Sequence, residues 1–158
     1  MAKDKNQNIL DLIATDHREV EQIFVQIESA SNLEQLYRHF NQLYKEVNLH
    51  ARAEELVFYP RLREYEDTDE MLEEAESEHD EAAALLEEIK ALSPDSAEFK
   101  EKVAELKEAI LHHVQEEESE VFETARDCMD DQQLKQLGQE FQQVKTKFED
   151  EIVEAASL

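Results

Sequence analysis

Four histidines stand among apolar residues at helical spacing, each in a different stretch of the chain. They are His17, His50, His79 and His113. Two of them are followed one helical turn later by glutamates, which are Glu54 after His50 and the neighbours Glu117 and Glu118 after His113. A polar group inside a helical core costs roughly 2–7 kcal/mol when it has no partner. Several imidazoles and carboxylates on inward faces are therefore expected to satisfy one another around metal ions.

The donor types indicate which metal this would be. A lone histidine on an apolar stripe is usually a hydrogen-bonded core residue, but four at one level need more partners than a core supplies. Nitrogen and oxygen donors without a thiolate argue against a structural zinc site. At least six donors exceed one tetrahedral site and fit two ions that share bridging carboxylates. Iron is the usual ion for histidine and carboxylate donors that meet oxygen.

Apolar stripes around these residues predict five amphipathic helices. In each stripe the steps alternate between three and four residues, which is the spacing of one helix face. The predicted helices span about 8–29, 33–65, 69–92, 97–126 and 132–155. Pro60 falls late in the second helix and is expected to kink it or to end its regular part.

The order of these helices predicts where the histidines meet. Short breaks join the first four helices, so they must run up and down against one another. His17 lies 14 residues before Ser31 and His50 lies 19 after it, and the other loops give similar offsets. At about 1.5 Å per residue these offsets leave the histidines within two turns of one layer. The expected fold is all-α, an up-down-up-down four-helix bundle over about 8–127 with an additional C-terminal helix over about 131–155, in a single domain of residues 1–158.

Composition supports a helical fold and limits the partners. The chain has 158 residues with one Gly and two Pro, which are too few for the turns of a sheet protein. Its formal net charge of −25 disfavours nucleic acid and anionic membranes as partners. No apolar run approaches the roughly 20 residues of a membrane span, and none resembles a signal peptide. Cys128, the only cysteine, cannot form a disulfide within the chain, which favours a cytoplasmic location.

Two families of helical bundles hold paired iron in this way. Ferritin-like proteins carry a Glu-x-x-His pair on each of two helices, but only Glu76-x-x-His79 has that spacing here. The ordered motifs of this chain resemble the hemerythrin family, and more closely its bacterial hemerythrin-like branch with the HHE cation-binding domain. The motifs that carry the resemblance are Asp16-His17, His50-Ala-Arg-Ala-Glu54-Glu55-Leu-Val-Phe58-Tyr-Pro60, Glu78-His79-Asp80-Glu81 and His112-His113-Val-Gln-Glu-Glu-Glu118-Ser-Glu-Val-Phe122.

The resemblance implies a di-iron site with terminal imidazoles and bridging carboxylates. The metal ligands that it assigns are His17, His50, Glu54, His79, His113 and Glu118. Two residues compete for the second carboxylate, since helical spacing from His113 favours Glu117 whereas the spacing in the family favours Glu118, which we prefer. The two irons are expected to share an oxo or hydroxo bridge, and manganese could replace them.

One position departs from the oxygen-carrying members of the family. They have a second histidine one turn before the residue that matches His79, where this chain has Ala75. Glu76 could reach the same face and take that place. The departure weakens the expectation of simple reversible oxygen carriage and favours oxidative chemistry at a more open iron.

The functions that the resemblance implies follow from this site. The first is binding of, or reaction with, O2 or a related small oxidant such as peroxide or nitric oxide, in storage, sensing or stress response. The alternative is an iron-handling or iron-sensing module without catalysis. Iron donation for iron–sulfur cluster repair ranks third, because relatives with that role carry an additional cysteine-bearing N-terminal domain. Whether the protein is an enzyme stays open, although weak peroxidase-, catalase- or oxidase-like activity fits an open iron. The fifth helix is expected to cap the bundle or to mediate a homodimer, so the chain is a monomer or a homodimer.

Overall fold

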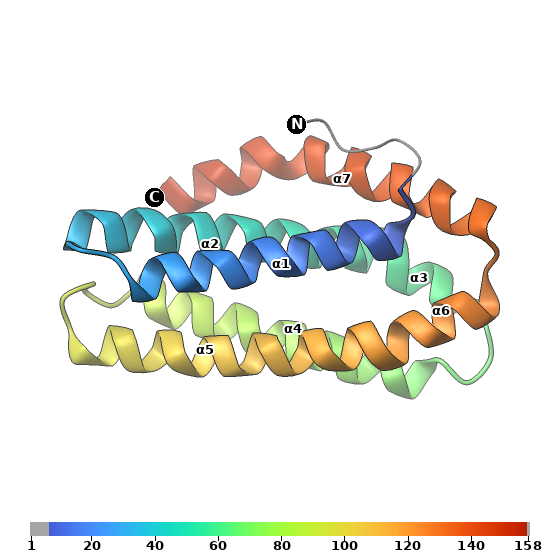
Figure 1. The fold of residues 1–158 in the computed structure, drawn as a ribbon, viewed down its shortest axis with the longest axis horizontal. Coiled ribbons are helices and arrows are strands. Elements are labelled where there is room, and N and C mark those ends of the chain that lie inside the picture. Colours follow the sequence, from blue (N-terminus) through green and yellow to red (C-terminus); the bar gives the residue numbers. More distant parts are fainter. Residues whose placement is uncertain (1–6, 158) are drawn as a thin grey trace.

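The computed structural model describes residues 7–157, and the side chains of residues 7–149 and 151. All the regular elements in this range are helices, arranged as a long antiparallel bundle with one further helix running along one side of it (Figure 1). They are α1 (Ile9–Glu28), α2 (Leu33–Ala53), η1 (Glu54–Phe58), α3 (Tyr59–Leu62), α4 (Asp69–Lys90), α5 (Ala97–Glu116), η2 (Glu117–Val121), α6 (Phe122–Cys128) and α7 (Asp131–Ser157). The all-α bundle with an additional C-terminal helix is confirmed, and residues 1–6 and 158 of the expected domain lie outside the described range.

The helix starts are fixed by side chains that cap free backbone N–H groups. The side-chain oxygens of Asn8, Asn32 and Ser96 each accept a hydrogen bond from the backbone N–H three residues later. The helical stretches end within three residues of the predicted limits. Among the described residues, none of these helices is both long and apolar enough to cross a membrane.

Two of the bundle helices widen into a π-helical turn partway along. The element η1 joins α2 to α3, and η2 joins α5 to α6, so each of these helices is continuous through its wide turn. Pro60 is the second residue after η1, and its ring obstructs the carbonyl four residues before it, which favours a wider turn there. In η2 the Ser119 hydroxyl donates to the carbonyl of Gln115 at 2.8 Å, a contact that distorts regular helices.

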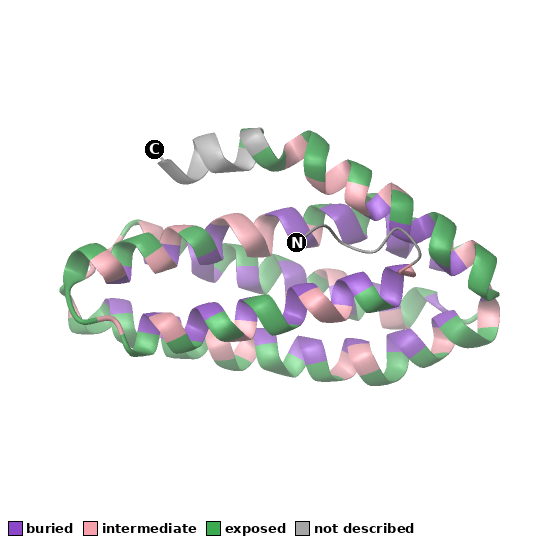
Figure 2. Ribbon diagram, turned by 45° about the horizontal axis from the view of Figure 1, so that its top comes forward, coloured by how far each residue is buried: buried purple, intermediate pink, exposed green. Residues whose placement is uncertain are grey.

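The buried residues form two apolar cores at the two ends of the bundle. The inward sides of the helices are buried along their length (Figure 2). One core contains Ile13 and Phe58, and the other contains Phe24 and Leu86. Between them, at one height, lie the buried polar residues Asp16, His17, His50, Glu54, His79, His113 and Glu117. The bundle thus holds one polar layer between two apolar ends.

The C-terminal helix α7 packs on α1 and α2 and covers that side of the bundle (Figure 1). Its Leu134, Leu137 and Phe141 are buried in the apolar core that includes the start of α1. Gly138 is the only glycine of the chain. A Cβ atom at this position would lie 2.7 Å from the carbonyl oxygen of Gln7. The absence of a side chain therefore allows α7 to approach the N-terminal end of α1.

Candidate metal centre

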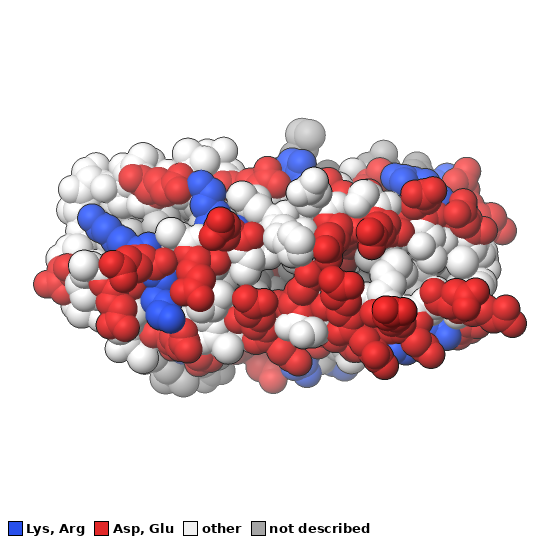
Figure 3. Space-filling view, turned by 90° about the horizontal axis from the view of Figure 1, so that it is seen from below, with Lys and Arg blue, Asp and Glu red and all other residues white. Residues whose placement is uncertain are grey.

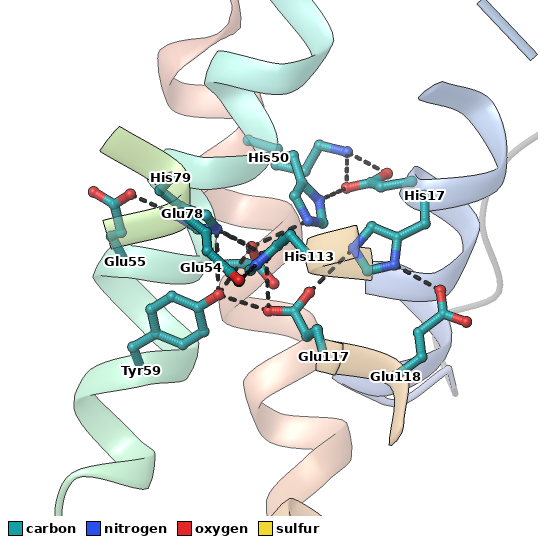
Figure 4. A network of polar contacts seen from close by, with 12 residues as sticks. His17, His50, Glu54, Glu55, Tyr59, Glu78, His79, His113, Glu117 and Glu118 are labelled. Atoms are coloured by element: carbon teal, nitrogen blue, oxygen red, sulfur yellow. Dashed lines mark hydrogen bonds and ion pairs between the residues drawn. The ribbon is translucent and has the colours of Figure 1, made fainter. Parts of the chain in front are cut away.

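The four histidines of the sequence analysis meet in the polar layer, with their Nε2 atoms directed at one another and at two glutamates (Figure 4). Glu54 Oε1 lies 3.2 Å from His50 Nε2 and 3.1 Å from His79 Nε2. Across the layer, Glu117 Oε1 lies 3.1 Å from His17 Nε2, and Glu117 Oε2 lies 3.6 Å from His113 Nε2. Each glutamate therefore reaches one histidine on each side of the layer.

These six side chains divide into two groups that could each hold an ion. One group is His17, His50, Glu54 and Glu117, and the other is Glu54, His79, His113 and Glu117. Within each group one ligand atom per residue lies within 4.8 Å of the others. Because both groups contain the same two glutamates, they describe two neighbouring cation sites joined by shared carboxylates.

Each histidine is oriented from behind by a carboxylate on its Nδ1 atom. Glu118 lies 2.7 Å from His17 Nδ1, and Asp16 lies 2.8 Å from His50 Nδ1. In the same way, Glu55 lies 2.7 Å from the Nδ1 atom of His79, and Glu78 lies 2.7 Å from that of His113. When Nδ1–H donates to a carboxylate, Nε2 is left with its lone pair directed inward, which is the arrangement found around metal-binding histidines.

These orienting carboxylates have a common position in the sequence. Each one is the direct neighbour of an inward-facing residue, in the dipeptides Asp16-His17, Glu54-Glu55, Glu78-His79 and Glu117-Glu118. Each also acts on a histidine of another helix, so that η2 orients α1, α1 orients α2, η1 orients α4, and α4 orients α5. The four helices are therefore linked in a closed circle.

The structure brings Glu117, and not the preferred Glu118, to the inward side of the layer. The side chain of Glu117 is 0% exposed, whereas that of Glu118 is 27% exposed and also pairs with Arg18. The reason is local geometry, because the backbone N–H of Glu117 donates to the carbonyl of His113 in a regular α-turn. The fourth residue after His113 therefore shares its face, and Glu118 becomes the carboxylate behind His17.

Tyr59, which is not among the predicted site residues, also reaches the layer. Its hydroxyl donates to Glu117 Oε2 at 2.6 Å and lies 3.2 Å from His79 Nε2. The backbone N–H of Tyr59 bonds to the carbonyl of Glu54, five residues earlier, through the wide turn η1. This π-helical spacing brings a residue at i+5 onto the face of residue i.

The place left open at Ala75 is not taken by Glu76. Ala75 is buried in the apolar core, and Glu76 lies at the surface in an ion pair with Arg63. The phenol of Tyr59 instead adds an oxygen beside His79. The two halves of the layer therefore differ, because the Tyr59 hydroxyl contacts His79 in addition to the two shared glutamates.

The buried polar atoms of the layer fit the presence of cations. Four of them lack a hydrogen-bond partner, namely His17 Nε2, His50 Nε2, Glu54 Oε2 and Glu117 Oε1. Burial lowers the pKa of His79, but hydrogen bonds with Glu54 and Glu55 outweigh this effect and raise it to about 10. Burial raises the pKa of Glu54, yet the charge of His50 and hydrogen bonds to His50 and His79 lower it well below its usual value. Glu54 thus needs positive charge beside it, which protons or metal ions would supply.

Lys145 connects α7 to this layer through Asp16. The Lys145 Nζ atom lies 2.7 and 2.8 Å from the two carboxylate oxygens of Asp16, which orients His50. Replacing Lys145 by Met is expected to weaken metal retention about 10- to 100-fold, the usual effect of disturbing a group behind a metal-binding histidine. Metal loss to a chelator measures this, and Lys147→Met, an exposed change of the same charge on α7, is the matched control. Equal loss rates in both variants would contradict the role of Lys145.

Comparisons with known proteins agree with this geometry. Residues 8–125 match the family model described as Hemerythrin HHE cation binding domain. The chain is 36% identical to a protein of Nostoc sp. named DNA nickase. The match covers 92% of this chain but only 41% of that protein, so this chain spans less than half of the relative's length. This chain is also 27% identical to an uncharacterized hemerythrin-like protein of Schizosaccharomyces pombe, and the match covers 89% of this chain and 70% of that protein.

A solved structure has the same fold. The crystal structure of a hemerythrin HHE cation binding domain-containing protein from Mycobacterium kansasii superposes with a TM-score of 0.82 at 19% identity, covering 92% of this chain and 89% of that one. The family match covers residues 8–125, which include the whole polar layer. The chain belongs to the hemerythrin HHE cation-binding domain family, and its bundle is a cation-binding module.

Proposed function

We propose that this protein is a non-haem di-iron protein that binds, or reacts with, O2 or a related small oxidant. The two groups of ligand atoms share Glu54 and Glu117, as a pair of bridged ions requires. His17, His50, His79 and His113 serve as terminal ligands in this proposal, and Glu117 takes the bridging place first given to Glu118. Bound iron of this type supplies the electrons that a small oxidant accepts.

A small apolar cavity beside the four histidines is the observation that carries the proposal. It has a volume of about 50 Å³ and touches all four imidazoles. Its other walls are mostly aliphatic, with Val20, Val47, Ala82 and Ile110 among them. A water molecule needs about 10–15 Å³ of such space, so the cavity has room for a molecule of two or three heavy atoms.

The surrounding residues control protons and water at this cavity. Burial and the nearby carboxylates of Glu54 and Glu117 raise the pKa of Tyr59 well above its usual value. The phenol therefore stays protonated and donates a hydrogen bond to Glu117 Oε2. The aliphatic walls keep bulk water away, which strengthens these polar contacts.

An anaerobic Fe(II) titration followed by exposure to air tests the proposal. We expect about two irons per chain and new near-ultraviolet and visible absorption after air, peroxide or nitric oxide is added. Absorption that reverses on deoxygenation would indicate an oxygen binder, and irreversible absorption would indicate oxidative chemistry or sensing. Two irons without any spectral response would contradict oxidant chemistry and favour the alternative, an iron-handling module without catalysis.

Replacing Tyr59 by Phe is expected to change this response without changing the metal content. The variant removes the hydroxyl that donates to Glu117 and leaves the aromatic ring in the core. Because the six proposed ligands remain, about two irons should still bind, while the absorption bands and the rate of reaction with air shift. Phe58→Leu, a change in the same turn away from the layer, is the control. An unchanged spectrum and rate in Tyr59→Phe would show that the hydroxyl has no part in the reaction.

The proposed function does not involve DNA binding. The name DNA nickase belongs to a relative of which this chain covers only 41%. A formal charge of −25 repels the phosphate backbone.

A further inference from the structure

We propose that His112, Glu78 and Glu116 form an outer divalent-cation site, from which the ion passes between α4 and α5 to the centre. His112 Nε2 lies 3.0 Å from Glu116 Oε1 and 3.6 Å from Glu78 Oε2. One ligand atom of each residue lies within 4.8 Å of the others. An imidazole with two carboxylates, open to water on the remaining sides, suits a hydrated Fe(II) or Mn(II) ion.

The outer site is accessible and yet touches the inner layer. The side chain of His112 is 63% exposed, whereas its sequence neighbour His113 is buried. Glu78 lies between them, with Oε2 near His112 and Oε1 2.7 Å from His113 Nδ1. One carboxylate therefore contacts both a surface imidazole and an imidazole of the proposed centre.

A narrow cavity continues from this site into the bundle. It has a volume of about 10 Å³, close to the space of one water molecule. Its acidic lining residues are Glu74, Glu78, Glu116, Glu117 and Glu120, and His113 also borders it. Exposure decreases along this lining, from exposed Glu74 and Glu120 through half-buried Glu78 and Glu116 to buried Glu117. At the inner end lies Glu117, whose Oε1 atom faces His17 Nε2 of the proposed centre at 3.1 Å.

The charge of the surface around this cavity favours cations. Asp and Glu dominate the middle of the face that α4 and α5 present (Figure 3). A surface of one sign that leads into a narrow opening concentrates ions of the opposite sign and speeds their capture. Glu78 is the one acidic residue that also lines the apolar cavity beside the histidines, whose other walls include Val47, Ala51 and Ala109. The acidic opening therefore favours the cation, and the apolar cavity favours the small oxidant.

Manganese binding to the iron-loaded protein tests the outer site. With the centre filled, we expect one additional Mn(II) per chain and paramagnetic broadening of the His112 imidazole signals, with the His39 signals unaffected. His112→Ala should lose the additional Mn(II), and His39→Ala, the control at the other histidine outside the layer, should retain it. Absence of His112 broadening in the wild type, or retention of the ion in His112→Ala, would overturn the outer site.

The rate of iron uptake tests the route. Anaerobic Fe(II) uptake by metal-free protein should slow by about tenfold or more in His112→Ala and in Glu120→Gln, since steering by charge contributes factors of this size. The final content should stay at two irons, and His39→Ala should load at the wild-type rate. Unchanged uptake rates in both variants would overturn the route. The inner end of the route rests on the proposed function, which a wild type that takes up no iron would disprove. The outer site is decided separately, by Mn(II) binding at His112.

Discussion

Glu117→Gln is expected to lower the metal content from two ions per chain to one or none, whereas Glu118→Gln should still bind two. Glu117 reaches toward His17 and His113 with its two carboxylate oxygens and belongs to both groups of ligand atoms. Replacing it by the neutral amide leaves two dications with one shared carboxylate, and the repulsion between buried like charges is then less compensated. Metal analysis after dialysis measures the difference.

Glu118→Gln is a matched control, since it makes the same change one residue away. It keeps the inward ligands and disturbs only the partner of His17 Nδ1. We expect an affinity loss of about 10- to 100-fold with an unchanged stoichiometry. If Glu118→Gln loses an ion and Glu117→Gln keeps two, the sequence-based preference for Glu118 would be right and the assignment of the bridge would have to be reversed.

Removal of the metal is expected to lower the melting temperature by about 10–20 °C. Ions that bind only the folded state add about 2.7 kcal/mol per site at a free concentration of 100 Kd. Two sites then give about 5 kcal/mol, and a chain of this size changes by about 2–4 °C per kcal/mol. Calorimetry of the iron-loaded and metal-free forms measures this shift. An unchanged melting temperature would contradict a metal pair in the polar layer.

The pH dependence of this difference follows from the histidine pKa values. Hydrogen bonds to carboxylates raise the pKa of His79 to about 10 and also raise those of His17 and His50, despite burial. In the metal-free protein, the stability from these protonated histidines is fully present below their usual pKa of 6.5 and is lost as the pH rises toward 10. Metal ions need the neutral imidazoles and bind more tightly over the same range. The gap between the two melting temperatures should therefore widen from pH 6 to pH 9.

The fold could be predicted from the sequence because helix faces, caps and loop lengths are local properties. The alternating steps of three and four placed His17, His50, His79 and His113 in one layer, and the structure has them there. The same counting from His113 pointed to Glu117. The motif spacing of the family led to the preference for Glu118, which the regular α-turn after His113 does not support.

Two features of the site could not be predicted from helical spacing and needed the three-dimensional structure. The turn η1 changes the period of the helix locally, so a count of 3.6 residues per turn from Glu54 does not bring Tyr59 onto the inward face. The carboxylates behind the histidines lie on neighbouring helices, and no single helix shows these contacts. In the sequence, each of these carboxylates stands beside an inward-facing residue. Because 41 of the 158 residues are acidic, these neighbours could not be distinguished from the many other acidic residues.

The closed circle of carboxylates has a consequence for how the protein is made. Asp16 and Glu118 each orient the histidine of a helix other than their own, and the circle includes α1, which is synthesised first, and η2, which follows almost a hundred residues later. A nascent chain that lacks α5 and η2 holds no complete set of donors for either ion, since both sets need Glu117. In the cell, the ions would thus be bound only after η2 has been synthesised. A prematurely terminated chain would have no complete site that could bind reactive iron.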